Sequence, residues 1–169
     1  MAKKTTKKAK EITDKYILVI GQVGGCKELD NSEIRGMQQL DNSVYRNAPK
    51  DTKVLFRRDP LATEAPHPLH THLERFPLPD NAENQGAQSI KDALSGALFV
   101  ITINSISIIE AIAAGIPCLA FGPCTGIDEG AVHQTSLKTL KKDIAEMVKG
   151  WKPSEGAINR FLGTGENYD

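Results

Sequence analysis

Short apolar runs along the chain alternate with stretches in which apolar residues recur at helical spacing. Four of the runs are apolar almost throughout, and the first, Tyr16–Ile20, ends at Gly21. Strands of a parallel sheet have this composition because helices cover both of their faces. The expected strands are 15–21, 53–58, 98–103 and 117–122.

The segments between these runs predict helices. Ser32 and Ser89 have side chains suited to a helix N-cap, and Gly115 is suited to a C-terminal cap. The last helix is the most clearly amphipathic, and its expected apolar stripe consists of Leu137, Leu140, Ile144 and Met147 or Val148. The expected helices are 32–48, 89–97, 105–115 and 136–151, with one further turn after residue 152.

Strands that alternate with helices predict an α/β fold, here a single Rossmann-like domain whose parallel sheet is covered by helices on both faces. We assign this domain to residues 14–152, between a disordered, lysine-rich tail at 1–13 and a C-terminal extension at 153–169. The proline-rich stretch 59–88 is expected to be an irregular, mobile loop.

The composition fits one soluble globular domain, because 40% of the 169 residues are hydrophobic and 25% are charged. The net charge of zero combines a tail that carries five lysines, from Lys3 to Lys10, with a remainder that has 16 basic and 21 acidic residues. Such a tail is normally solvated, and its alternative role is a salt-sensitive contact with nucleic acid.

The sequence features that indicate cellular location are typical of a cytoplasmic protein. No apolar run reaches the ~20 residues that span a bilayer, and the lysine-rich start lacks the apolar core of a signal peptide. The cysteines Cys26, Cys118 and Cys124 are odd in number and form no CxxC pair. We therefore expect a cytoplasmic protein without a membrane span or a disulfide framework.

Ligands of open parallel sheets bind beyond the carboxyl ends of the strands, so the turns that leave the strands are candidate sites. "GQVGG" follows the first strand, and Gln22, Gly24 and Gly25 allow close approach of a phosphate, although a tight strand exit explains them as well. "RRDP" follows the second strand, and its Arg57 and Arg58 are either anion ligands or ordinary surface charges.

The turn "ITINSISIIE" interrupts an apolar strand with polar residues just before a helix. Ser105 and Ser107 lie at the expected helix start, where backbone N–H groups attract anions. Asn104 and Glu110 accompany them, and Glu110 either accepts hydrogen bonds from ribose hydroxyls or only complements the helix dipole. Capping explains the serines but not the whole group, so this turn predicts a nucleotide-type ligand.

Two other groups of reactive side chains are weaker candidates. His67, His70 and His72 could ligate zinc, but Pro68 disfavours a regular scaffold and no acid or cysteine adjoins them at a typical spacing. We therefore expect no metal. Nothing in the sequence marks Cys124 as a nucleophile.

The stretch "VITINSISIIEAIAAGIPCLAFG" resembles the "TxNSxxxxEAxxxGxPxxxxG" signature of capsule-polysaccharide-type glycosyltransferases, the bacterial Kdo-transferase group. "YILVIGQV" and "KVLFRRDPL" resemble two strands that precede the signature in that family. The resemblance covers residues 15 to 150, and only 101–122 is specific. It implies one half of a GT-B fold, namely the C-terminal domain that binds a sugar nucleotide.

Carried over by position, the resemblance implies that Ser105 and Glu110 contact the phosphate and the ribose of the nucleotide. Gln22 and the glycines after it would line the same cleft, and "GPCTG" would face the donor sugar. The expected sugar-binding residues are Gly122, Thr125 and Gly126 of that turn, together with His67.

The chain departs from the family in two respects. Asp59-Pro60 stands where the family has His-Pro, so the cationic contact falls to Arg57, Arg58 or His67. GT-B enzymes also have two such domains with the active site between them, and this chain has one. We therefore expect a glycosyltransferase subunit that uses a sugar nucleotide, needs no cofactor, and works with a partner subunit or as a homo-oligomer.

Two alternatives stay open at the level of the sequence. One is a non-catalytic protein that binds a nucleotide or a sugar nucleotide. The other is a nucleic-acid-modifying glycosyltransferase, in which the tail from Lys3 to Lys10 contacts the nucleic acid.

Overall fold

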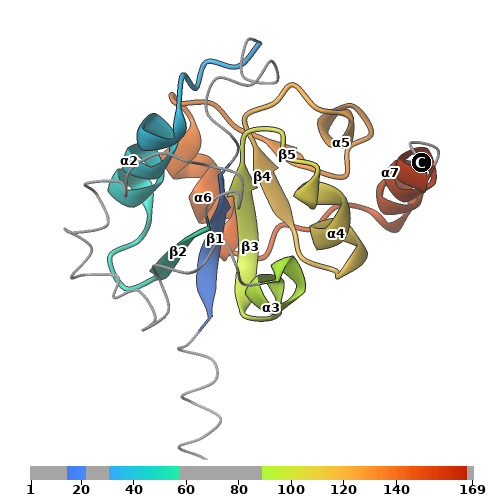
Figure 1. The fold of residues 1–169 in the computed structure, drawn as a ribbon, viewed down its shortest axis with the longest axis horizontal. Helices are drawn as coiled ribbons and strands as arrows, with labels where there is room; N and C mark the ends of the chain where they lie inside the picture. The colour runs from blue at the N-terminus through green and yellow to red at the C-terminus, as the bar shows by residue number, and fades with distance from the viewer. Residues whose placement is uncertain (1–14, 22–30, 58–88, 167–169) are drawn as a thin grey trace, which may run out of the picture.

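The computed structural model describes residues 15–21, 31–57 and 89–166 (Figure 1). These residues form a five-stranded parallel sheet in the order β2-β1-β3-β4-β5. The α/β fold expected from the alternating pattern is confirmed. The strands are β1 (Tyr16–Ile20), β2 (Lys53–Arg57), β3 (Ala97–Thr102), β4 (Cys118–Ala120) and β5 (His133–Gln134).

Helices cover both faces of this sheet, as the sequence predicts (Figure 1). α2 and α6 pack on one face, α3, α4 and α7 pack on the other, and α5 lies in the connection from β4 to β5. Within the described ranges, no helix is long and apolar enough to cross a membrane. The helices are α2 (Met37–Asn47), α3 (Ile90–Ser95), α4 (Ser107–Ala113), α5 (Thr125–Asp128), α6 (Leu140–Val148) and α7 (Glu155–Glu166).

Strand β1 is an interior strand between β2 and β3, and helices cover both of its faces. Its residues alternate between two cores. Ile17 and Val19 pack beneath α2 and α6, whereas Leu18 and Ile20 pack beneath the helices of the opposite face. None of these four side chains exposes more than 2% of its surface, which explains the unbroken apolar run in the sequence.

The first helix, α2, begins later than the sequence predicts. The expected N-cap, Ser32, instead accepts a hydrogen bond from the backbone N–H of Ile34 at 3.1 Å. This local turn competes with helix formation and directs Ile34, which is fully buried, into the core beneath α2 and α6. The helix then begins at Met37, after Gly36 at the N-cap.

The C-terminal half differs from the expected pattern at two helices. In α6, Leu140, Ile144 and Met147 form the buried stripe, whereas Leu137 lies before the helix and Val148 is 48% exposed. α7 is a helix of 12 residues rather than a single turn. Its glycine-rich sequence has low helix propensity, so the packing of its buried residues against α4 and the core of that face stabilises it.

Packing beneath α7 requires a glycine in α5. An added Cβ at Gly126 would lie 2.5 Å from Val132 Cγ2 and 3.5 Å from a ring carbon of Phe161 in α7. Both neighbours are buried, so neither can move aside without disturbing the core.

We expect Gly126→Ala to destabilise the protein by about 1–3 kcal/mol, because it overpacks this contact. Gly163→Ala is the matched control: an added Cβ at this exposed helical glycine meets nothing within 4 Å, and it should increase stability by up to about 1 kcal/mol. Urea unfolding monitored by circular dichroism measures both changes. Equal effects of the two substitutions would contradict the packing role of Gly126.

Candidate functional site at the carboxyl ends of the strands

The strand order places a topological switch point between β1 and β3. From β1 the chain passes through α2 to β2 on one side, whereas from β3 it passes through α4 to β4 on the other side. Connections therefore diverge at the carboxyl ends of β1 and β3. In sheets of this order, 2-1-3-4-5, ligands bind in the crevice that this divergence creates.

Hydrogen bonds hold the ends of four strands together at this edge. Thr102 Oγ1, fully buried at the end of β3, donates to the carbonyl oxygen of Ile20 at 3.0 Å. The N–H of Gly21 donates to Arg57 O at 2.8 Å, and the N–H of Gly122 donates to Ile103 O at 2.8 Å. The turns that leave β1, β3 and β4 consequently start from fixed positions.

The structure brings together two segments that the sequence selects. Asn104 lies just beyond β3, and its Nδ2 approaches the carbonyl oxygen of Pro123 in the "GPCTG" turn at 3.4 Å. Ser105 Oγ accepts a hydrogen bond from the N–H of Ser107 at 3.2 Å, which shapes the start of α4. Asn104, Ser105 and Ser107 are all partly exposed, so their polar groups lie at the surface of this edge.

The fold itself requires glycine at two positions of the "GPCTG" turn. Gly122 adopts a φ of +73°, and an added Cβ would lie 2.6 Å from Ile127 Cδ1. Gly126 is buried against Val132. Thr125, the first residue of α5, is partly exposed. Among the three residues of this turn that are implied to face the sugar, Thr125 therefore has the accessible side chain.

Arg57 and Glu110 lie on other elements than Asn104 and Ser105. Arg57 ends β2, separated from β3 by β1, so about two strand spacings, or roughly 10 Å, separate its backbone from that of Thr102. Glu110 is exposed in the first turn of α4. Its side chain lines an open groove of about 630 Å³ between α3 and α4, whose other lining residues are Lys91, Leu94, Ser95, Ala113, Ala114 and Ile116.

Several predicted site residues lie outside the described residues. They are Gln22, Gly24, Gly25, Arg58 and His67. The lysine-rich tail at 1–13, the loop at 59–88 and the cysteine Cys26 also lie outside.

The described cysteines are not activated nucleophiles. Burial raises the pKa of Cys124 more than the backbone amides of Ile127 and Gly126 lower it, and the nearby Asp128 carboxylate raises it further. Burial also raises the pKa of Cys118, a fully buried residue of β4. At neutral pH both thiols are protonated, and a protonated thiol is a poor nucleophile.

Sequence reasoning missed a polar cluster beside β5. His133, Asp143 and Glu146 have potential ligand atoms that all lie within 4.8 Å of one another. One available signal was the Asp-x-x-Glu spacing in α6, which places two carboxylates on one face of that helix. Another was Asp143 itself, a charged residue directly beside the buried stripe position Ile144.

The fold and this edge define a Rossmann-like α/β domain with its candidate site at the β1/β3 switch point. Among solved structures, the chain is similar to the KpsC beta Kdo 2,7 transferase of Thermosulfurimonas dismutans, with a TM-score of 0.54 and 21% identity over 90% of this chain. It also matches a Listeria monocytogenes protein assigned as a UDP-N-acetylglucosamine 2-epimerase, with a TM-score of 0.48 and 19% identity over 95% of this chain.

The chain spans about half the length of both structures, 54% of the first and 48% of the second. No protein-family model and no curated protein matches the sequence. The resemblance of the "TxNSxxxxEAxxxGxPxxxxG" stretch to the Kdo-transferase group is thus confirmed at the level of the fold, as one half of a GT-B architecture.

We expect Cys124 and Cys118 to react with iodoacetamide far more slowly than free cysteine at pH 8, because their raised pKa values leave little thiolate. The rate at Cys124 should increase at a higher pH than for free cysteine. Peptide mass spectrometry after timed alkylation measures each site, and the same chain in denaturant provides the control. Rapid native labelling of Cys124 at pH 8 would contradict the burial argument.

Proposed function

We propose that this chain is the sugar-nucleotide-binding half of a glycosyltransferase and binds its donor at the carboxyl edge, over the β1/β3 switch point. The observation that carries the proposal is the convergence of Asn104 and Ser105 with the Gly122–Pro123 turn, on a fold shared with about half of a Kdo transferase. Open α/β sheets bind nucleotides at this position.

Each candidate side chain has a role in this proposal. Ser105 and Asn104 donate hydrogen bonds to phosphate oxygens, Glu110 accepts hydrogen bonds from the ribose hydroxyls, and Thr125 contacts the sugar. Arg57, at the end of β2, supplies positive charge on the far side of β1. These assignments rest on the position of each residue and on the resemblance of the "NSxxxxE" stretch.

The proposed reaction is a direct displacement at the anomeric carbon. An acceptor hydroxyl attacks that carbon, the bond to the phosphate oxygen breaks, and the nucleotide leaves with the bonding electron pair. The hydrogen-bond donors and Arg57 would offset the negative charge that develops on the leaving phosphate. The base that removes the proton of the acceptor would come from the other half of the enzyme.

A second half must complete such a site, either from a partner subunit or from a second copy of this chain. Ile106 supports this arrangement, because it follows Ser105 at the edge of the candidate site and leaves 78% of its surface exposed. A partner that closes over the carboxyl edge would bury this side chain and exclude water from the donor.

A thermal-shift screen of CMP, UDP, GDP, ADP and their sugar conjugates tests donor binding. We expect one of these nucleotide families to stabilise the chain. Ligand at ~100 times its Kd adds about 2.7 kcal/mol of stability. Glu110→Ala should abolish most of the shift because it removes the ribose contact. Glu155→Ala, which removes an exposed carboxylate from the first turn of α7, is the matched control and should keep the shift.

The outcomes of this screen are distinct. No shift with any nucleotide would contradict donor binding by this half. An equal shift in the Glu110→Ala variant would contradict the position of the site. Binding without transfer, even when candidate second halves are supplied, would favour the non-catalytic binder.

A further inference from the structure

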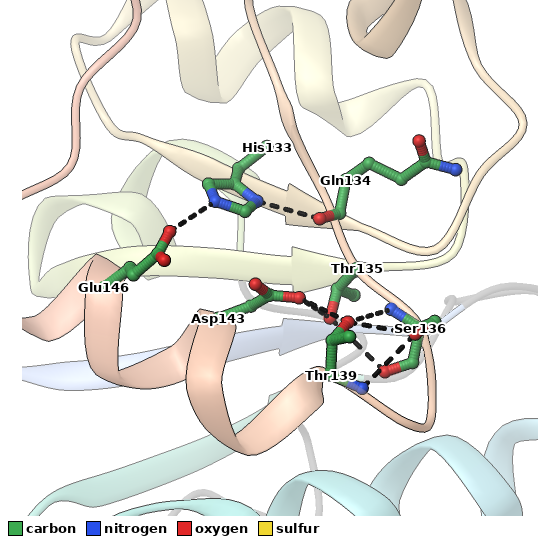
Figure 2. Close-up of polar contacts among 7 residues, drawn as sticks. All are labelled: His133, Gln134, Thr135, Ser136, Thr139, Asp143 and Glu146. Carbon is green, nitrogen blue, oxygen red and sulfur yellow. Dashed lines mark hydrogen bonds and ion pairs between the residues drawn. The ribbon is translucent and has the colours of Figure 1, made fainter.

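His133, Asp143 and Glu146 converge where the edge strand β5 meets α6 (Figure 2). His133 comes from β5, whereas Asp143 and Glu146 lie one turn apart on α6. His133 pairs with Leu119, whose side chain belongs to the core beneath α2 and α6. The cluster therefore lies on the opposite face of the sheet from α4 and is separate from the proposed nucleotide site.

The ring of His133 is oriented by three contacts. Nδ1 lies 2.8 Å from the carbonyl oxygen of Gln134, to which it can only donate, and Nε2 lies 2.8 Å from Glu146 Oε2. The indole of Trp151 packs edge-on against the ring at 5.0 Å. A histidine that donates Nδ1–H to a backbone carbonyl presents the lone pair of Nε2 outward, which is the arrangement found in metal-ligating histidines.

Asp143 is a carboxylate with only 6% of its surface exposed. The hydroxyls of Thr135 and Thr139 both donate to its Oδ2, at 2.8 and 2.7 Å (Figure 2). These donors are neutral, and a buried carboxylate needs a compensating positive charge as well as hydrogen bonds. They also fix the orientation of the carboxylate, as outer hydrogen bonds do for metal ligands.

Nε2 of His133 and the two carboxylates therefore lie within 4.8 Å of one another, and the two negative charges need a cation between them. One candidate cation is a proton on Nε2, which would make the cluster an imidazolium ion pair. The other is a divalent metal ion. Imidazole combined with carboxylates is a donor set that suits Zn²⁺.

We propose that His133 Nε2, Asp143 and Glu146 bind one Zn²⁺-class ion that links the edge strand β5 to α6. Zinc bonds of about 2.0–2.1 Å place tetrahedral ligand atoms about 3.4 Å apart. To bind the ion, the 2.8 Å distance between His133 Nε2 and Glu146 Oε2 must increase slightly. The longer distances among the three ligand atoms, which reach up to 4.8 Å, must decrease. Glu146 can make this adjustment because its side chain is 42% exposed, which also opens a path for the ion and leaves a fourth position for water.

Titration of the full chain, first stripped of metal with a chelator, tests the proposal. Co²⁺ serves as the probe because its visible absorption reports ligand number, and Zn²⁺ should displace it. We expect one tightly bound equivalent and an increase in Tm with Zn²⁺. Glu146→Gln and His133→Asn should each weaken binding by more than about tenfold, since loss of an outer hydrogen bond alone costs 10–100-fold.

Two controls test whether the metal binds at this cluster and whether the variants keep their fold. A variant with His67, His70 and His72 all replaced by Gln should keep the same affinity, which excludes the other histidines of the chain. The Tm of Glu146→Gln in chelator shows whether that variant still folds, and Asp143 is left unchanged because it is buried.

Two results would overturn the proposal. One is an unchanged Co²⁺ affinity in Glu146→Gln and His133→Asn. The other is an absence of binding at millimolar Co²⁺ and Zn²⁺, which would assign the cluster to an ion pair. Neither result bears on nucleotide binding.

Discussion

Burial of the four residues from Ile17 to Ile20 in β1 is the constraint on which the other features depend. With helices on both faces and strands on both sides, the backbone of β1 can pair only with β2 and β3, and its side chains must be apolar in both directions. Because β2 occupies one side of β1, the next strand that pairs with β1, which is β3, has to lie on its other side, and β4 and β5 follow beyond β3. The switch point follows from this order, and the buried hydroxyl of Thr102 ties β3 to β1 where the connections diverge.

Much of this architecture could be predicted from the sequence because the central strands are apolar runs bounded by glycine or polar residues. The edge strand β5 could not, since it consists of His133 and Gln134 and depends on pairing with β4 rather than on its own composition. The length of α7 could not be predicted for a related reason. Its glycines lower the helix propensity of the segment, and contacts with residues far away in the sequence stabilise the helix.

Some residues of the candidate sites could likewise be selected from the sequence, and others could not. Asn104 and Ser105 could be identified because they interrupt an apolar run at a strand end, where ligands of parallel sheets bind. The groove beside Glu110 could not, because it depends on how α3 packs against α4. The cluster around His133 was equally inaccessible, since its members meet only when β5 lies beneath α6.

The two outer strands of the described sheet also bear on colloidal behaviour. A long, flat, uncharged edge strand can pair with the same strand of another molecule, and such pairing can start fibril growth. Here β5 has two residues and offers almost no ladder for such growth, while β2, with five, carries Lys53 and Arg57 at its ends. Two copies of β2 paired edge to edge would bring like charges together. This repulsion disfavours association of the protein through its sheet edges at high concentration.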